Sequence, residues 1–98
     1  MNIFLQRRAE IALRSLDKTE QKRILRSLSN IEAIDRVNLA QDPKFRKLAT
    51  GFSGKKLYIY KGSPKIRLIL SFEEDVCTVE DIVDHDRLSR LIAQRGQE

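Results

Sequence analysis

The sequence predicts a single α+β domain spanning residues 1–98. In it, an N-terminal helical hairpin packs on a small antiparallel sheet of three or four strands, and a short helix ends the chain. Three observations lead to this prediction. A chain of 98 residues has room for one hydrophobic core. Apolar residues recur every three to four positions near the N-terminus, which is the period of a helix. From Lys55 onward they recur every second position, which is the period of a strand.

The N-terminal part of the chain is predicted to form two helices joined by a very short turn. Asp17 would cap the second helix, with Glu20 three residues later as its capping-box partner. Residues 2–5, before the first helix, read either as a short strand or as the beginning of that helix. The apolar stripes lie at Ala9, Ala12, Leu13 and Leu16 in the first helix and at Ile24, Leu25, Leu28, Ile31 and Ile34 in the second.

The middle of the chain, residues 37–53, is predicted to be an irregular connection. Asp42 precedes Pro43, and a residue before proline avoids the helical conformation. Phe45 and Leu48 would anchor this connection to the core.

An antiparallel meander of three strands should follow, at residues 57–60, 66–72 and 76–83. Alternation along the middle strand places Ile66 and Leu68 on one face and Arg67 on the opposite face. Asp86 is predicted to cap the final helix.

The composition favours an anionic partner. The chain has 19 lysines and arginines against 14 acidic residues, a net charge of +5 and a pI of about 9.7. A basic balance of this kind is typical of proteins that bind RNA, DNA or an acidic protein. No stretch approaches the length of a membrane span and no signal peptide is recognisable, so we expect a cytoplasmic protein without a membrane partner.

Cysteine and histidine each occur once. Cys77 lies in an apolar run, which favours a buried structural thiol, and a lone cysteine excludes an intramolecular disulfide. A lone histidine, His85, would leave a zinc site dependent on carboxylates. We therefore expect no metal and no cofactor.

Residues 47–85 read KLATGFSGKKLYIYKGSPKIRLILSFEEDVCTVEDIVDH. In order, they contain a leucine–glycine loop, a strand, a turn, a strand with an arginine near its start, an acidic turn and a last strand ending in histidine. This order resembles the RelE/ParE superfamily of toxins from bacterial toxin–antitoxin systems, and the resemblance covers nearly the whole chain. It implies a cognate antitoxin as partner and, for a RelE-type toxin, metal-independent cleavage of mRNA on the ribosome.

The resemblance also implies the site. Arg67 and His85 match the family's arginine and histidine and are the expected catalytic residues. In RNA cleavage of this kind the 2′-hydroxyl attacks the adjacent phosphate. An arginine suits stabilisation of the charged phosphorane, and a histidine suits proton transfer. The expected substrate-binding residues are Lys55, Lys56, Tyr58, Tyr60, Lys61, Lys65 and Arg87.

Most of these residues also have a purely structural explanation. Arg67 would then be solvated or would pair with Glu80 or Asp81, and His85 would be a cap or a surface histidine. Tyr58 and Tyr60 would be half-buried sheet residues, and the lysines would form a charged rim at a hairpin edge. The chain departs from the family pattern at the two tyrosines, where RelE-type ribonucleases often carry basic residues. No tyrosine follows the last strand, and that strand is acidic.

Three functions therefore remain open from the sequence. The first is a RelE-type endonuclease that acts on ribosome-bound RNA. The second is a ParE-like toxin that binds DNA gyrase, and the third is a binding protein that kept the fold and lost the chemistry.

Overall fold

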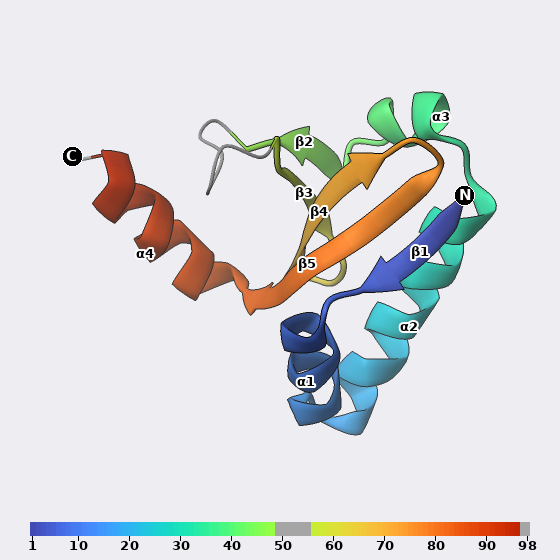
Figure 1. Ribbon diagram of the computed structural model, residues 1–98. Helices are drawn as coiled ribbons and strands as arrows, with labels where there is room; N and C mark the ends of the chain where they lie inside the picture. The colour runs from blue at the N-terminus through green and yellow to red at the C-terminus, as the bar shows by residue number, and fades with distance from the viewer. Residues whose placement is uncertain (49–55, 97–98) are drawn as a thin grey trace.

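Within the residues that the structure describes, five strands form one mixed sheet and four helices accompany it (Figure 1). The structure is a computed structural model that describes the backbone of residues 1–48 and 56–96 and the side chains of residues 1–48 and 56–90. The elements, in chain order, are β1 (Asn2–Leu5), α1 (Arg7–Ser15), α2 (Lys18–Ala33), α3 (Arg36–Ala40), β2 (Phe45–Lys47), β3 (Tyr58–Lys61), β4 (Ile66–Glu73), β5 (Val76–Asp84) and α4 (His85–Gly96).

The sheet has the strand order β1-β5-β4-β3-β2. The antiparallel meander β3-β4-β5 is present as predicted, and the α+β fold class is confirmed. Two strands enlarge the sheet beyond the expected three or four. Residues 2–5 form β1, which runs parallel to β5, and residues 45–47 form β2, which pairs with β3.

The connection between α2 and β3 is more regular than predicted. Asp35 caps the short helix α3, because its Oδ1 accepts a hydrogen bond of 2.8 Å from the backbone N–H of Asn38. Leu39 in this helix is buried in the core. Phe45 lies in β2, although a strand of three residues is too short to reveal a period of two in the sequence.

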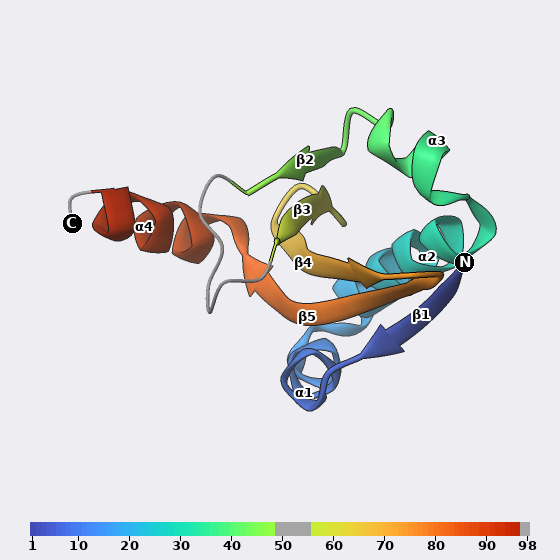
Figure 2. The same cartoon turned by 45° about the horizontal axis from the view of Figure 1, so that its top comes forward.

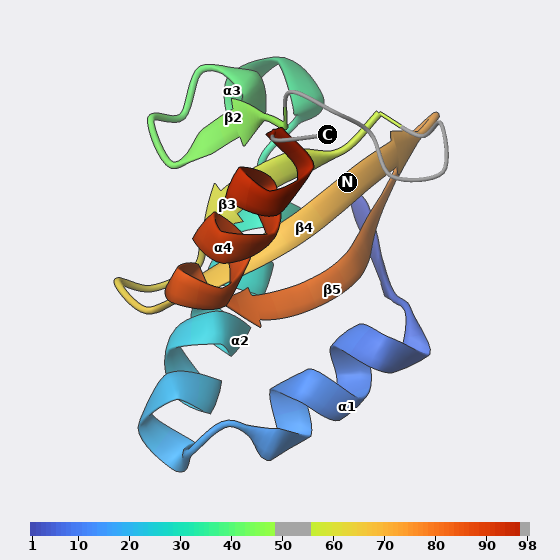
Figure 3. The ribbon, with the colours of Figure 1, turned by 90° about the vertical axis from the view of Figure 1, so that its left-hand side faces the viewer.

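The helical hairpin forms as predicted, with one difference at its cap. Asp17 Oδ1 accepts a hydrogen bond of 2.8 Å from the backbone N–H of Glu20. The Glu20 carboxylate does not complete a capping box, since it binds Ser63 and Arg23 instead. Leu25 also departs from the predicted stripe, because its side chain is 52% exposed. Figure 3 shows α1 below the strands and α2 running up behind β4 and β5.

Two hydrophobic clusters lie on opposite faces of the sheet. The larger one lies between the hairpin and the sheet and contains Ala9, Ile24, Leu28, Ile31, Leu39, Tyr60, Ile66, Leu68, Leu70, Cys77, Val79 and Ile82. The smaller one contains Leu48, Leu57, Ile59, Ile69, Val83 and Leu88. Strand β4 contributes to both clusters, because alternate residues of a strand point to opposite faces. Leu88 belongs to the first turns of α4, so the smaller cluster joins that helix to the sheet.

The helix α4 begins where β5 ends and extends away from the rest of the molecule (Figures 1 and 2). Its cap is Asp84 and not the predicted Asp86. Asp84 Oδ1 accepts hydrogen bonds from the backbone N–H groups of Asp86 (2.8 Å) and Arg87 (3.3 Å). No helix among the described residues is long and apolar enough to cross a membrane.

Candidate nucleic-acid interface

A cationic face of the sheet lies opposite the helical hairpin. Strand register pairs Lys61 with Arg67 and Arg46 with Ile59, and paired residues of neighbouring strands point to the same face. Lys61 and Ile59 are two residues apart on β3 and therefore also share a face. Arg46, Lys61 and Arg67 consequently come from three adjacent strands and gather on one side of the sheet.

Arg67 is held by the turn between β3 and β4. Its Nη1 atom donates to the carbonyl oxygens of Ser63 (2.8 Å), Pro64 (3.2 Å) and Ile66 (3.3 Å). These carbonyls carry only partial charge, so the guanidinium keeps its full positive charge uncompensated. Burial and, to a lesser extent, the neighbouring Arg46 lower the pKa of Arg67. The charge of Arg46 is thus close enough to act on Arg67, and a cluster of like positive charges attracts anions.

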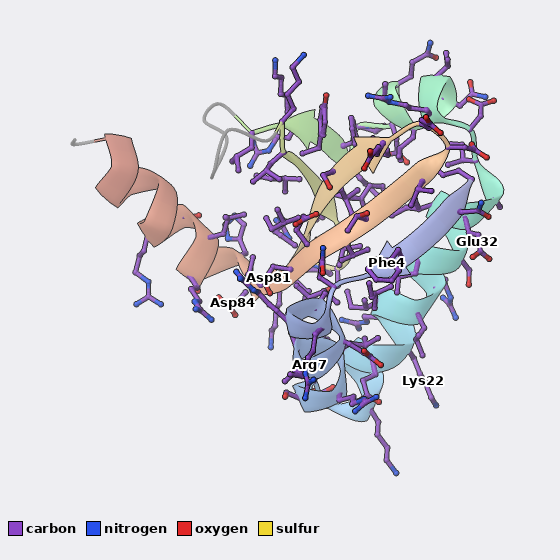
Figure 4. The ribbon with its side chains drawn as sticks, viewed as in Figure 1. Phe4, Arg7, Lys22, Glu32, Asp81 and Asp84 are labelled. Atoms are coloured by element: carbon purple, nitrogen blue, oxygen red, sulfur yellow. The ribbon has the colours of Figure 1, made fainter. Side chains whose placement is uncertain are left out.

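The structural explanation of Arg67 as one half of an ion pair is wrong. Within the described part of the chain, Arg67 forms no salt bridge. The two carboxylates expected to neutralise it have other contacts. Glu80 Oε2 accepts a hydrogen bond of 2.8 Å from Ser71 Oγ, and Asp81 Oδ2 lies 3.9 Å from Nη1 of Arg8. Figure 4 shows Asp81 and Asp84 near the end of β5, close to the start of α4.

His85 lies at the same end of the sheet as Arg67. Its backbone N–H donates to the carbonyl oxygen of Lys65 at 2.8 Å, which places His85 opposite the residue just before β4. Arg67 pairs with Val83, two residues earlier on β5, so the two backbone positions are about 7 Å apart along the strand. The imidazole Nδ1 lies 3.4 Å from Asp86 Oδ1. Among the described residues, no hydrogen bond joins the Arg67 and His85 side chains.

The two tyrosines point to the opposite face. Tyr60 pairs with Leu68, is 2% exposed and belongs to the larger core cluster. Burial and the charge of Asp42 raise the pKa of the Tyr60 phenol. Tyr58 stacks on Phe45 with ring centroids 5.1 Å apart. Neither tyrosine shares a face with Arg67, and Tyr60 exposes no ring on which a base could stack.

The other basic residues predicted to bind the substrate lie at different places around this face. Lys61 and Lys65 are exposed beside the turn that holds Arg67, and Lys56 is exposed just before β3. Arg87 is exposed in the first turn of α4. Lys55 lies outside the described residues.

One basic residue of the cationic face was not predicted. Arg46 joins it only because residues 45–47 form a strand. Lys44, two residues before Arg46, lies beside the end of β3, since its carbonyl oxygen accepts a hydrogen bond of 2.9 Å from the backbone N–H of Lys61. The alternation of Lys44 and Arg46 is the only sequence signal that points to this face, and it has meaning only once the strand is known.

Cys77 is a structural residue, as predicted. Its side chain is fully buried in the larger cluster, and burial raises the pKa of the thiol to about 12. At neutral pH the thiol is therefore protonated, whereas a nucleophile must be a thiolate. Among the described residues no cluster of three His, Cys, Asp or Glu side chains is arranged to hold a metal ion.

The order of the strands, the helical hairpin and the helix that leaves β5 define the RelE-like class of small α+β folds. No protein-family model matches the chain, and no curated protein sequence matches it. Eight solved protein chains do match its structure.

Three of these structures illustrate the likeness. A chain of the archaeal RelE–RelB complex from Pyrococcus horikoshii OT3 is 20% identical, with a TM-score of 0.66 over 88% of this chain and 96% of that one. YafQ from E. coli strain BL21(DE3) is 15% identical, with a TM-score of 0.65 over 89% and 96% of the two chains. The YoeB dimer from Staphylococcus aureus is 20% identical, with a TM-score of 0.60 over 83% and 92%. The resemblance to the RelE/ParE superfamily is thereby confirmed at the level of the fold.

Proposed function

We propose that the chain is the toxin of a toxin–antitoxin module and cleaves mRNA on the ribosome without a metal ion. The observation that carries this proposal is Arg67, an arginine held by a turn on a face where Arg46 and Lys61 also lie and paired with no carboxylate of the described chain. The likeness of fold to RelE, YafQ and YoeB supports the same proposal.

In this proposal Arg67 stabilises the phosphorane. Nη1 is engaged by the carbonyls of the turn, so the orientation of the guanidinium is fixed before RNA binds. The other N–H donors of the planar group can then bind two phosphate oxygens of the reacting group. Donors fixed in advance at developing charge are usually the largest contribution to catalysis of this type.

The remaining roles follow from position. Lys61, Lys65 and Arg46 would bind the RNA backbone on the cationic face, with Lys56 and Arg87 at its margins. His85, at the same end of the sheet, would transfer a proton to or from a ribose oxygen. Lys55 remains a proposed substrate-binding residue on the basis of the sequence alone. We leave Tyr58 and Tyr60 out of the site, since they lie on the face covered by the hairpin.

A cognate antitoxin is the second part of the proposal. Two of the similar structures are complexes, RelE with RelB and DinJ with YafQ. A chain with a net charge of +5 suits an acidic partner, because complementary charge speeds association and selects against wrong partners. We propose that the antitoxin covers the cationic face and so excludes RNA from it.

A binding protein without catalysis is the second candidate. One observation favours it, namely that the recorded contact of the His85 imidazole is with Asp86 and not with Arg67. Such a protein would bind RNA on the same face without cutting it. No described feature favours gyrase as the target.

The test is inducible expression in a bacterium that lacks a matching antitoxin, with growth followed and mRNA ends mapped by primer extension. We expect growth arrest with new cuts in translated messages. Arg67→Ala and His85→Ala should each reduce the cuts at least tenfold, as is typical of the loss of one catalytic group.

The matched control is Lys22→Ala, which removes one positive charge from the outer side of α2 (Figure 4) and should leave the cuts unchanged. Cuts that persist in Arg67→Ala would contradict the proposed catalytic role. Arrest with intact messages and a DNA-damage response would point to gyrase. Soluble protein without any arrest would favour the binding protein.

A further inference from the structure

A depression of about 400 Å³ opens beside the turn between β3 and β4. Arg23, Lys44 and Lys61 contribute to its wall, and Pro43 and turn residues 62–64 form the rest. In the part of the chain that the structure describes, no acidic residue lines it. Glu20 pairs with Arg23, so the three positive side chains leave a net positive charge of two around the recess, which favours the binding of an anion.

The turn between β3 and β4 forms one wall of this recess, and hydrogen bonds tie two other parts of the chain to the turn and its preceding strand. Just before β2, the Lys44 carbonyl oxygen accepts from the backbone N–H of Lys61 at 2.9 Å. From α2, Ser27 Oγ donates to the carbonyl oxygen of Gly62 at 2.8 Å. The wall is therefore fixed by hydrogen bonds in the absence of a ligand, which lowers the entropic cost of binding one.

A nearly buried carboxylate orients the arginine of the recess. Glu20, 8% exposed, accepts from Ser63 Oγ at 2.7 Å through Oε2 and from Arg23 Nη1 at 2.9 Å through Oε1. The Arg23 side chain remains 52% exposed. Glu20 thus engages one nitrogen of the guanidinium, and the other N–H donors remain able to reach a ligand.

The recess and Arg67 lie on two sides of the same turn. The Ser63 and Pro64 carbonyls bind Arg67, while both residues also line the recess. Lys61 belongs to both sites, because it lines the recess and pairs with Arg67 in the sheet. An RNA strand carries one phosphate per nucleotide and so can place one phosphate at each site.

We propose that this recess is a second phosphate-binding site, which holds a neighbouring phosphate of the RNA strand whose scissile phosphate lies at Arg67. The proposal rests on the proposed function for the identity of the ligand. It assigns to Arg23 and Lys44 a role in placing the strand, and it predicts that they act on binding and not on the chemical step.

The experiment measures the affinity of the full chain for a 2′-O-methyl oligoribonucleotide by fluorescence anisotropy at several KCl concentrations. This probe keeps the phosphates and lacks the attacking hydroxyl, so binding is separated from cleavage. Lys44→Ala and Arg23→Gln should each raise Kd about fivefold, the effect expected for one exposed charge contact. The slope of log K against log salt should fall in magnitude by about 0.7 for each lost contact.

Lys22→Ala is the control, since it lies one residue from Arg23 on the same helix and lowers the net charge by the same amount. Its Kd and salt slope should match those of the wild type. Identical values for Lys44→Ala and Lys22→Ala would overturn the proposal. So would a Lys44→Ala variant that binds RNA normally but loses binding to poly-glutamate, since that result identifies an acidic protein as the ligand.

The failure of the recess and the failure of the proposed function are distinguishable. Arg67→Ala with unchanged mRNA cutting, together with weakened RNA binding in Lys44→Ala, would refute the role of Arg67 and support the recess. Loss of cutting in Arg67→Ala, with no effect of Arg23→Gln or Lys44→Ala on Kd or slope, would support the role of Arg67 and refute the recess as a phosphate site.

Discussion

Gly62 occupies the place where the turn between β3 and β4 passes closest to α2. A Cβ atom at this position would lie 2.7 Å from Cδ1 of Ile24 and 3.5 Å from Cγ of Leu68. Both side chains are fully buried, so neither can move aside without disturbing the core. The absence of a side chain at Gly62 therefore lets the turn approach the helix, and this approach brings Lys61 near Arg23.

We predict that Gly62→Ala lowers the free energy of unfolding by about 1–2 kcal/mol through overpacking. Ile24→Val removes the methyl group in the way and should cost about 1 kcal/mol by itself. In the double variant the clash is absent, so the combined loss should be smaller than the sum of the single losses. Urea unfolding of the four proteins measures this coupling. Strictly additive losses would show that the close approach is unimportant.

At the scale of elements, the boundary between β5 and α4 matters most for the site. His85 is the first residue of α4, and its backbone N–H still bonds to Lys65 beside β4. The position of the imidazole therefore depends on where the strand stops and the helix begins. Asp84 sets that point, since its carboxylate accepts from two N–H groups of the first turn.

We predict that Asp84→Ala destabilises the start of α4 by about 1 kcal/mol, the usual cost of a lost cap. Amide hydrogen exchange in residues 86–90 should become faster, while exchange in β4 stays as in the wild type. Asp86→Ala is the comparison, because Asp86 was the cap expected from sequence and forms no capping bond in the structure. Equal acceleration in both variants would contradict the assignment of Asp84 as the cap.

Elements long enough to repeat their hydrophobic pattern several times were predictable from the sequence, and elements of a few residues were not. The stripe at Ile24, Leu28 and Ile31 identified α2, and the alternation around Leu68 identified β4. The three residues of β2 are too few to show a repeat, so the sequence does not predict that Arg46 lies in a strand of the sheet. The sequence predicts Asp86 as the cap of α4, two residues after the observed cap, because Asp84 and Asp86 are equally good capping residues. Only the hydrogen bonds of the folded chain distinguish them.

The face of Arg67 was predictable, whereas its partners were not. Alternation alone separated Arg67 from Leu68. The sequence left Glu80 and Asp81 as possible ion-pair partners, because register across β4 and β5 is not visible in it. In the structure Ile69 pairs with Asp81 and Leu70 with Val79, so the ladder is irregular at this point. This bulge inserts Glu80 between two paired positions of β5 and displaces the register on which a prediction would depend.

At the scale of the whole molecule, the sheet is a central layer with apolar clusters on both faces. Cys77 lies in the larger cluster, on β5, paired with Ile3 on one side and Phe72 on the other. Neighbouring strands on both sides and the hairpin above exclude water from the thiol. Its exposure consequently requires opening of the sheet as a whole and not of one edge.

We predict that Cys77 reacts with a thiol reagent at pH 8 only as fast as the protein unfolds. Full burial and a pKa of about 12 both suppress the thiolate in the folded state. The labelling rate should rise with urea in parallel with global unfolding. An added thiol at an exposed helix position, Ser29→Cys, should react at once. Comparable rates at the two sites would contradict this prediction.

The same thiol makes stability depend on pH in a defined direction. Its pKa is about 12 in the fold against an ordinary value of 9.0, so the unfolded state loses the proton first as pH rises. The free energy of unfolding should therefore decrease above about pH 9.

The pairing of β1 with β5 has a consequence for the order of events during synthesis. Among the strands of the described residues, β1 precedes all the others in the chain, yet its one neighbour in the sheet is β5, which comes last of them. Residues 2–5 therefore emerge with no template for pairing and must wait until residues 76–79 have been added. Contacts between such distant parts of a chain form slowly, because a long loop must close first. A nascent chain can build α1, α2 and the β3-β4 hairpin early, but it completes its sheet only after β5 has been made.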